Sequence, residues 1–551
     1  MSRTTTPEHG DAGLAAGEAD GDSRQHRESG KEKDSDGDKD TAGLRRALSW
    51  IALVVSAGAG ALLSVGAFLG LYVRPTSDDW CALWKARDMG VLGITADFYR
   101  TQNGRVTNAF LTGIIYSDDM RGPKLLPALL VVTLGAGLFL LARAALRALR
   151  LPAPPPVLLA AAAALLSALL FFAGTRSYQV LLWAPATVSH TLPSVIGLWA
   201  VLGAVRAARG GHRWARTVAV VSAFPTGMAL GMLSEPFAMV AGLLAGTAAL
   251  LCLPRLGWTK DRYVPTWCAS LCLGLVAGLV LLTTSPGARW RRAQHPQEPL
   301  SAALVGETFR DWWRVWETIA GQGAYAGAAA VGALLGLALG LTLAPAGSTA
   351  HTPGSTAHTP GSTPGQAPST GGRTSTAGLP PRRLFRIAVL LPLPLIALAS
   401  LAVTYGLRTG YGAVGWTYGR TWTSFLFPLL LALCAYGTWG GYRLGLLLRR
   451  AGRPAARAAA LVAVGAIAVG STAALVRPVY ELTTSTVVRA TAWDRQNARI
   501  KAEVAAGARE VAYRPLLIGG LTEPLFARTY ERDWAAQCTA TYYGVDRIHR
   551  P

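Results

Sequence analysis

The chain has 551 residues, of which 51% are apolar and only 15% are charged, and its mean hydropathy is +0.31. A soluble protein of this length usually carries about 25% charged residues, so the composition excludes an ordinary soluble enzyme and favours a polytopic helical membrane protein. The net charge of +22 would suit a nucleic-acid-binding protein. Much of this charge, however, lies in short loops between apolar runs, as the positive-inside rule requires. We therefore expect membrane lipid, and no nucleic acid, as a partner.

The N-terminal stretch 1–44 is rich in Gly, Asp, Glu, Ser and Lys and has no apolar period, which predicts a disordered cytoplasmic tail. The following apolar run is too long for a signal peptide and should be an uncleaved anchor. Arginine greatly outnumbers lysine, and alanine and glycine are abundant, which is typical of a GC-rich bacterial genome. Apolar runs predict about eleven spans, at 48–73, 124–142, 156–173, 187–205, 216–234, 236–254, 264–284, 324–345, 385–405, 423–441 and 457–477.

Clusters of arginine alternate with these spans and all fall on one side of the membrane, which places the N-terminus in the cytoplasm and the C-terminus outside the plasma membrane. The predicted organisation is a transmembrane core over 45–345 with an extracytoplasmic loop at 75–123, and a second core part over 382–477. Between them, 346–381 repeats a Gly-Ser-Thr-Pro unit typical of a flexible cytoplasmic linker. His351 and His358 in this linker lack the fixed geometry of a metal site. Residues 478–551 predict a small extracytoplasmic α/β cap.

Two polar motifs lie in the first outer loop. Asp78 and Asp79, followed by Trp80, come just after the first span. A carboxylate near low dielectric has a raised pKa and can serve as a base, although a solvated pair that ends a helix is the alternative. Further along, Asn103 and the following glycine predict a turn that presents Arg105, whose forked guanidinium suits a phosphate at the membrane surface. An ordinary snorkelling arginine is the competing interpretation.

Later outer segments add further candidates, which are Trp183, His190, Glu235, Arg291 and Arg420. The positive-inside rule disfavours arginine on the outer side, so topology alone does not explain Arg291 and Arg420. An anionic partner would explain them, either as a lipid headgroup or as a bound pyrophosphate or phosphate-linked lipid. Cys81 and Cys538 are the two cysteines expected on the oxidising outer side, and we expect them to form a disulfide.

The order of these motifs resembles the GT-C-type integral-membrane glycosyltransferases, and most of all an uncharacterised family of bacterial multi-pass proteins. The resemblance covers 45–551 without the linker, and it rests on the following matches. They are Asp78-Asp79-Trp80, Asn103-Gly104-Arg105, the Trp183 to Pro193 segment, Glu235, Pro286-Gly287-Ala288-Arg289-Trp290-Arg291, Arg420 and Tyr542-Tyr543-Gly544-Val545. Two positions depart from the pattern, because Ala288 replaces an asparagine and His190 stands where similar proteins carry an aromatic residue.

The resemblance implies an all-α, GT-C-like cell-envelope enzyme that transfers a sugar from a polyprenyl phosphate to an extracytoplasmic glycan acceptor. Asp79 would be the base, supported by Asp78 and Glu235. Arg105, Arg291 and Arg420 would bind the phosphate, and Asn103, Trp80, Trp183 and His190 would complete the substrate site. No cofactor is implied, and a divalent ion stays open because an Asp-Asp pair supplies too few ligands by itself. The alternatives are a transporter or flippase for an anionic lipid-linked glycan, and a membrane protein without catalysis.

Overall fold

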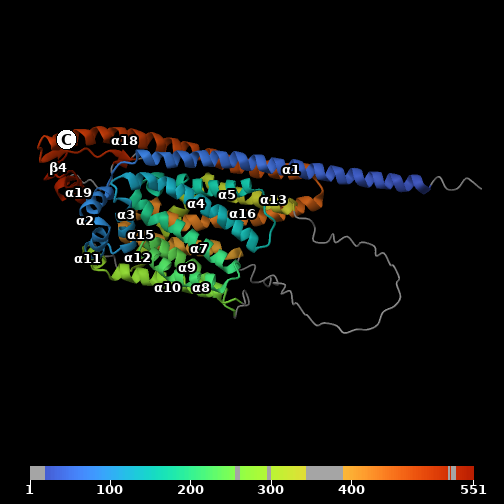
Figure 1. Cartoon of the computed structure of the whole chain (residues 1–551), viewed down its shortest axis with the longest axis horizontal. Coiled ribbons are helices and arrows are strands. Elements are labelled where there is room, and N and C mark those ends of the chain that lie inside the picture. Colours follow the sequence, from blue (N-terminus) through green and yellow to red (C-terminus); the bar gives the residue numbers. More distant parts are fainter. Residues whose placement is uncertain (1–18, 255–260, 295–299, 343–388, 519–520, 523–528) are drawn as a thin grey trace, which may run out of the picture.

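The computed structural model describes residues 19–254, 261–294, 300–342, 389–518, 521–522 and 529–551, and of 19–42 it describes the helical backbone. The linker 346–381, with His351 and His358, lies outside these residues, as does 1–18 of the N-terminal tail. The described chain is a polytopic helical bundle (Figure 1). Eight helical stretches in it are long and apolar enough to cross a membrane, namely Gly43–Tyr72, Arg121–Ala148, Ala184–Arg209, Tyr263–Thr284, Gly323–Leu341, Pro392–Thr417, Gly419–Ala451 and Pro454–Ala505.

These eight stretches coincide with eight of the eleven expected spans, and the other three expected spans are also helices. They are α5 (Pro156–Phe172), α8 (Arg213–Gly231) and α9 (Glu235–Leu251). With 17 residues each, α5 and α9 are short for a bilayer core of about 30 Å. Most side chains of α5 are buried, so other helices surround it. The count of eleven crossings stays a prediction.

The remaining bundle helices follow from the apolar runs. They are α1 (Ala19–Leu69), α4 (Arg121–Ala148), α7 (Leu192–Arg209), α10 (Tyr263–Thr284), α13 (Ala326–Thr342), α15 (Pro392–Tyr411), α16 (Thr423–Ala451) and α17 (Pro454–Ala474). Helix α1 begins at Ala19, within the N-terminal stretch 1–44 that the sequence predicts to be disordered. Extending an existing helix gains one backbone hydrogen bond per residue without a new nucleation cost, which allows a polar segment to continue the span.

Glycines determine how closely two pairs of bundle helices approach. A Cβ added at Gly274 of α10 would lie 2.1 Å from the Phe224 carbonyl oxygen of α8. A Cβ added at Gly332 of α13 would lie 2.0 Å from the Cys434 carbonyl oxygen of α16. Both pairs use glycines four residues apart, the spacing that lets membrane helices pack backbone to backbone.

Short elements gather at one end of the bundle, near the C-terminus (Figure 1). They are α2 (Asp78–Thr101), α3 (Val106–Ile115), α6 (Ala184–His190), α11 (Pro286–Gln294) and α12 (Ala302–Gly321), with the shorter turns η1 (Gly70–Tyr72), η2 (Tyr178–Leu182), η4 (Gly323–Tyr325), η5 (Gly412–Thr417) and η6 (Gly419–Trp422). The sites proposed from the sequence all fall on these elements or directly beside them.

The C-terminal segment is mixed, as expected, but its main part is the long helix α18 (Val476–Ala505), which contacts α1 (Figure 1). Beyond it lie β1 (Glu510–Ala512), β2 (Leu517–Ile518), β3 (Leu521–Thr522), η7 (Tyr530–Arg532), α19 (Trp534–Tyr543) and β4 (Arg547–His549). Strand β1 pairs with β4 in parallel, from Glu510 with Arg547 to Ala512 with His549. Strands β2 and β3 form an antiparallel pair. These two small sheets are the only strand pairs among the described residues.

Candidate functional site

The two adjacent aspartates at the start of α2 have different surroundings. Asp79 is only 1% exposed. Its Oδ2 accepts a hydrogen bond from the Thr76 backbone N–H at 2.9 Å, and its Oδ1 accepts one from the Tyr116 hydroxyl. Burial raises the pKa of Asp79 to about 7, against the lowering effect of these two hydrogen bonds. Both carboxylate oxygens of Asp79 are therefore engaged inside the protein.

Asp78, by contrast, is half-buried and has no hydrogen-bond or ion-pair partner among the residues that the structure describes. Burial raises its pKa, and Coulombic attraction from Arg420, Arg291 and Arg105 opposes the rise. Three arginines from distant parts of the sequence thus act on one carboxylate. The candidate arginines of the sequence analysis thus act on Asp78, whereas the charges that act on Asp79 are those of Asp78 and Arg489.

The Asn-Gly-Arg turn brings Arg105 next to the segment that carries Arg291. Gly104 has φ +74, and a Cβ there would lie 2.0 Å from Ser285 Oγ. Only glycine fits both the left-handed backbone and this contact. Asn103 Oδ1 accepts a hydrogen bond from the Arg105 backbone N–H at 3.0 Å, which fixes the turn. Ser285 in turn caps α11, since its Oγ accepts from the Ala288 N–H at 3.1 Å. The role of Asn103 is therefore to shape the turn.

Glu235 holds Arg105 in place. Arg105 Nη2 lies 2.7 Å from Glu235 Oε2, and Arg105 Nε donates to Oε1 at 3.4 Å. Glu235 is the first residue of α9, and Ser234 caps that helix by accepting from the Phe237 N–H. The two side chains are 23% and 34% exposed, so a ligand can still reach Arg105. The predicted site residue Glu235 thus belongs to the same cluster.

Arg420 lies against two aromatic rings. Its guanidinium carbon is 5.1 Å from the centre of the Trp183 ring and 5.0 Å from that of Tyr418, within cation–π range. Thr423 Oγ1 donates to the His190 carbonyl oxygen at 3.0 Å and so ties the Arg420 turn to α6. Arg420 itself forms no ion pair with a carboxylate among the described residues.

A fourth arginine, Arg176, also belongs to this region, although it is not among the phosphate binders expected from the sequence. Burial and then the Arg420 charge lower the pKa of Arg176. A Cβ at Gly419 would lie 3.4 Å from Arg176 Cγ, so the Arg420 turn packs directly on Arg176. Its position at the outer end of a span, like that of Arg420, was the signal that could have identified it. Two like charges held together without a described carboxylate favour an anion between them.

Two buried ring nitrogens beside Arg420 have no hydrogen-bond partner among the described residues: Trp183 Nε1 and His190 Nδ1. These residues are 4% and 8% exposed. The charges that act on His190 are Arg420 and Arg105. Asn108 Nδ2 donates to Ser189 Oγ at 2.9 Å, which joins α3 to α6 next to His190. The cluster thus contains polar groups that the described protein leaves unsatisfied.

Trp80 lies in an aromatic cluster. It is 0% exposed and is surrounded by four rings, which belong to Trp493, Tyr513, Tyr542 and Tyr543 at centroid distances of 5.3–6.2 Å. The ring of Trp80 therefore packs against the C-terminal segment, and its contact with a substrate stays a prediction. The tyrosines of the C-terminal signature belong to the same aromatic cluster.

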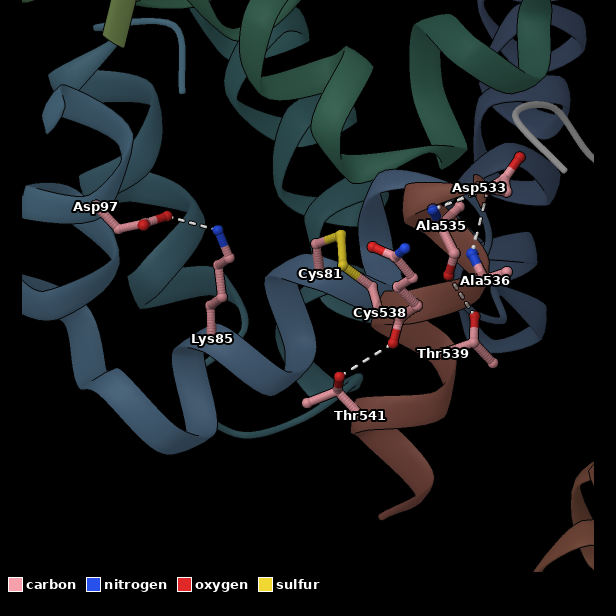
Figure 2. Close-up of a disulfide and its surroundings, with 10 residues drawn as sticks. Cys81, Lys85, Asp97, Asp533, Ala535, Ala536, Cys538, Thr539 and Thr541 are labelled. Carbon is pink, nitrogen blue, oxygen red and sulfur yellow. Dashed lines mark hydrogen bonds and ion pairs between the residues drawn. A yellow bond between two sulfur atoms is a disulfide. The ribbon is translucent and has the colours of Figure 1, made fainter. Parts of the chain in front are cut away.

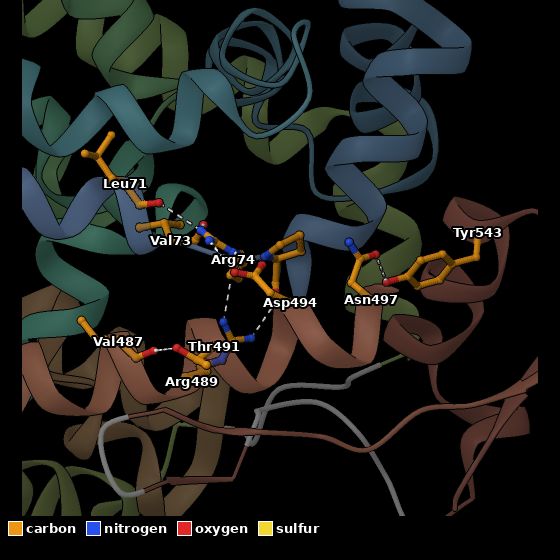
Figure 3. A network of polar contacts seen from close by, with 10 residues as sticks. Leu71, Val73, Arg74, Val487, Arg489, Thr491, Asp494, Asn497 and Tyr543 are labelled. Atoms are coloured by element: carbon orange, nitrogen blue, oxygen red, sulfur yellow. Dashed lines mark hydrogen bonds and ion pairs between the residues drawn. The ribbon is translucent and has the colours of Figure 1, made fainter. Parts of the chain in front are cut away.

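A disulfide and the hydrogen bonds of two arginines attach the C-terminal segment to the loop that carries the aspartates. Cys81 of α2 and Cys538 of α19 are bonded, with 4.9 Å between their Cα atoms (Figure 2). Arg74 pairs with Asp494 of α18 through Nε–Oδ1 at 2.7 Å and Nη2–Oδ2 at 2.9 Å (Figure 3). Arg489 donates to the carbonyl oxygens of Arg74 and Pro75. These contacts fix the backbone directly before Asp78.

In the part of the chain that the structure describes, no three His, Cys, Asp or Glu side chains form a group that could hold a metal ion. The described cluster consists of one carboxylate without a protein partner, an Arg105–Glu235 pair and three further arginines. Such an arrangement can bind an anionic group and take up a proton beside it.

Comparison with known proteins adds no assignment to this geometry. No protein-family model matches the chain, and neither a curated protein nor a solved structure is similar to it.

Proposed function

We propose that the chain is a membrane glycosyltransferase that transfers a sugar from a polyprenyl-phosphate donor to an extracytoplasmic acceptor. The observation that supports this best is the carboxylate of Asp78, which has no described protein partner and experiences the charges of Arg105, Arg291 and Arg420. A base beside a cluster of cations is the arrangement that transfer from a lipid phosphate requires.

In the proposed step, Asp78 accepts the proton of an acceptor hydroxyl while the hydroxyl oxygen forms a bond to the anomeric carbon of the sugar. The bond between that carbon and the phosphate oxygen breaks, and the electron pair leaves with the lipid phosphate. Arg291 and Arg420 neutralise the charge that grows on the phosphate. Trp183 Nε1 and His190 Nδ1, which lack described partners, supply further polar contacts to the donor. The reaction balances without a cofactor.

Asp78 is a better base than Asp79, the residue favoured by the sequence. Both oxygens of Asp79 accept hydrogen bonds from within the protein, and the residue is only 1% exposed, so an acceptor hydroxyl cannot reach its carboxylate. We assign Asp79 and Glu235 as positioning residues. Asp79 fixes the start of α2, and Glu235 orients Arg105.

Transport of an anionic lipid-linked glycan would use the same arginines. A transport pathway, however, typically places charged residues at mid-depth in several spans. Here Asp78, Arg105, Glu235 and Arg291 lie at helix ends or in loops at one end of the bundle, which favours transfer at the membrane surface.

The test uses the purified full-length protein, radiolabelled polyprenyl-phosphate hexoses and pentoses, and the variants Asp78→Asn and Asp119→Asn. Asp119 is exposed and has a left-handed backbone, which asparagine tolerates, so it is a matched control. Loss of a general base slows catalysis by about 10²–10⁴-fold. Asp78→Asn should therefore lose transfer yet still bind the donor, because a negative charge beside the phosphate has been removed. Equal transfer by Asp78→Asn and the wild type would contradict the proposal.

A further inference from the structure

A cavity of about 620 Å³ lies where α1, α4, α5 and α13 meet. It is lined by residues from the start of the span Gly43–Tyr72 and the end of the span Arg121–Ala148. Because α4 begins beside the Asp78 loop and runs to this cavity, the cavity lies at the opposite end of that helix from the candidate site. Nothing in the proposed transfer reaction uses it.

The polar lining of this cavity is entirely basic. Arg45 contributes from α1, and Arg143 and Arg147 contribute from α4. The two α4 arginines are four residues apart and so lie on one face of the helix. An adjoining cavity of about 400 Å³ shares them and adds Arg206 and Arg209 of α7. Among the described residues no carboxylate lines either cavity.

Most of these charges lack a partner among the described residues. Arg209 Nη1 donates to the Ala144 carbonyl oxygen at 3.2 Å and so connects α7 to α4. The side chains of Arg45, Arg143, Arg147 and Arg206 make no hydrogen bond or ion pair with any residue that the structure describes. Like charges gathered without counter-charge repel each other, and a bound anion would relieve that repulsion.

The rest of the larger cavity is apolar, with Leu48, Phe139 and Leu159 among its lining residues. A small inorganic anion gains nothing from such a wall, whereas a lipid places its headgroup on the arginines and its first methylenes on the leucines. Trp50, five residues after Arg45, is 66% exposed, as is typical of an indole at the headgroup level. The combination identifies a ligand with an anionic head and an apolar body.

We propose that the cavity lined by Arg45, Arg143 and Arg147 binds an acidic phospholipid of the leaflet opposite the candidate site. The phosphate lies among the three arginines, and Arg206 and Arg209 extend the basic surface toward a second headgroup oxygen or phosphate. This binding does not depend on the proposed transferase activity.

The test is native mass spectrometry of the full-length protein with phosphatidylglycerol or phosphatidylcholine, and with the double variant Arg143→Gln/Arg147→Gln. The matched control is Arg450→Gln/Arg453→Gln, which removes two exposed arginines that line neither cavity. Each arginine near an anionic headgroup strengthens binding about fivefold. The cavity variant should therefore bind phosphatidylglycerol roughly 25-fold more weakly than the wild type. The control should change less than twofold, and phosphatidylcholine should bind weakly to all three proteins.

Two results would overturn the proposal. Equal weakening in the control and cavity variants would show a diffuse surface charge effect, and displacement of phosphatidylglycerol by millimolar inorganic phosphate would show a small-anion site. If the double variant does not give folded protein, Arg45→Gln from the other helix replaces it. A roughly fivefold loss is expected there, and an unchanged affinity would count against the site.

Discussion

At the residue scale, the neighbouring carboxylates of Asp78 and Asp79 have different surroundings. Successive helical residues point about 100° apart, so one can be buried against Tyr116 while the other faces the arginines. Asp79 organises the start of α2 through Thr76 and Tyr116. Asp78 then lies in the basic cluster with its oxygens available. The distinction decides which aspartate a mutational study should examine first.

The raised pKa of Asp79 predicts a specific pH dependence of stability. Its folded pKa of about 7 exceeds its usual value of 3.8, so the folded chain retains a proton that the unfolded chain releases. The associated stability is fully present below about pH 4 and is lost as the pH rises to about 7. Over this range the free energy of unfolding should fall by on the order of 4 kcal/mol. Asp79→Asn cannot titrate and should flatten this dependence, measured as the melting temperature in detergent from pH 4 to 8.

Asp118→Asn is the control for this measurement, because Asp118 is exposed and pairs only with Arg121 among the described residues. It should keep the wild-type slope. Burial also raises the pKa of Asp78, so a residual slope of the same sign should remain in Asp79→Asn. If the stability of Asp79→Asn changed with pH as steeply as that of the wild type, Asp79 would be ionised in the folded protein.

At the element scale, the site depends on the fit of the Asn-Gly-Arg turn against the junction of α10 and α11. Gly104 contacts Ser285, and a Cβ at Gly287 would lie 2.7 Å from the Gln102 backbone nitrogen. Two glycines from segments far apart in the sequence therefore allow these segments to interlock. The fit brings Arg105 and Arg291 to the same carboxylate.

Gly104→Ala should separate these two segments. The new methyl group would combine a left-handed backbone with a 2.0 Å contact to Ser285 Oγ, which should lower the free energy of unfolding by about 2–4 kcal/mol. The matched control is Gly211→Ala, whose φ is +70 but whose Cβ would meet nothing within 4 Å. The control should lose only about 1–2 kcal/mol. Chemical denaturation of both variants provides the comparison, and equal losses would argue against the interlock.

Much of the architecture and several site residues could be predicted from the sequence. Apolar length predicts the helices of the bundle, and the positive-inside rule makes outer arginines such as Arg420 anomalous. Contacts between distant segments could not be predicted, and such contacts enclose Trp80 and engage both oxygens of Asp79. The rings of Trp493, Tyr513, Tyr542 and Tyr543 that enclose Trp80 lie more than 400 residues away in the chain. The number of crossings also depends on packing, because a surrounded helix such as α5 does not need full bilayer length.

At the scale of the whole molecule, the C-terminal segment is attached to the loop that carries Asp78. The Cys81–Cys538 disulfide joins residues 457 positions apart, and the aromatic cluster around Trp80 fills the space beside it. Tyr543 donates to Asn497 Oδ1 at 2.9 Å, which connects α19 to α18 (Figure 3). The loop that carries Asp78 is thus held between the membrane helices and the C-terminal segment. Preorganisation of this kind lowers the cost of ordering a binding loop when the ligand arrives.

The molecule also separates its charges between its two ends. The Asp78 cluster combines acidic and basic groups at one end, and the arginines of α1, α4 and α7 line basic cavities at the other. Under the predicted topology the first end faces outward. A phosphate-linked lipid would then be bound outside, while acidic phospholipids would bind at the inner end.

The central claim is that Arg291 and Arg420 bind the phosphate of a lipid next to Asp78. It is tested most directly by measuring polyprenyl-phosphate binding to the purified protein by titration calorimetry in detergent. Arg291→Gln and Arg420→Gln are compared with Arg292→Gln, whose guanidinium instead donates to the Thr283 carbonyl oxygen at 2.7 Å. Loss of a charge-assisted contact to phosphate should weaken binding by about 10-fold or more in each site variant, with Arg292→Gln close to the wild type. Unchanged affinity in both site variants, or an equal loss in all three, would contradict the claim.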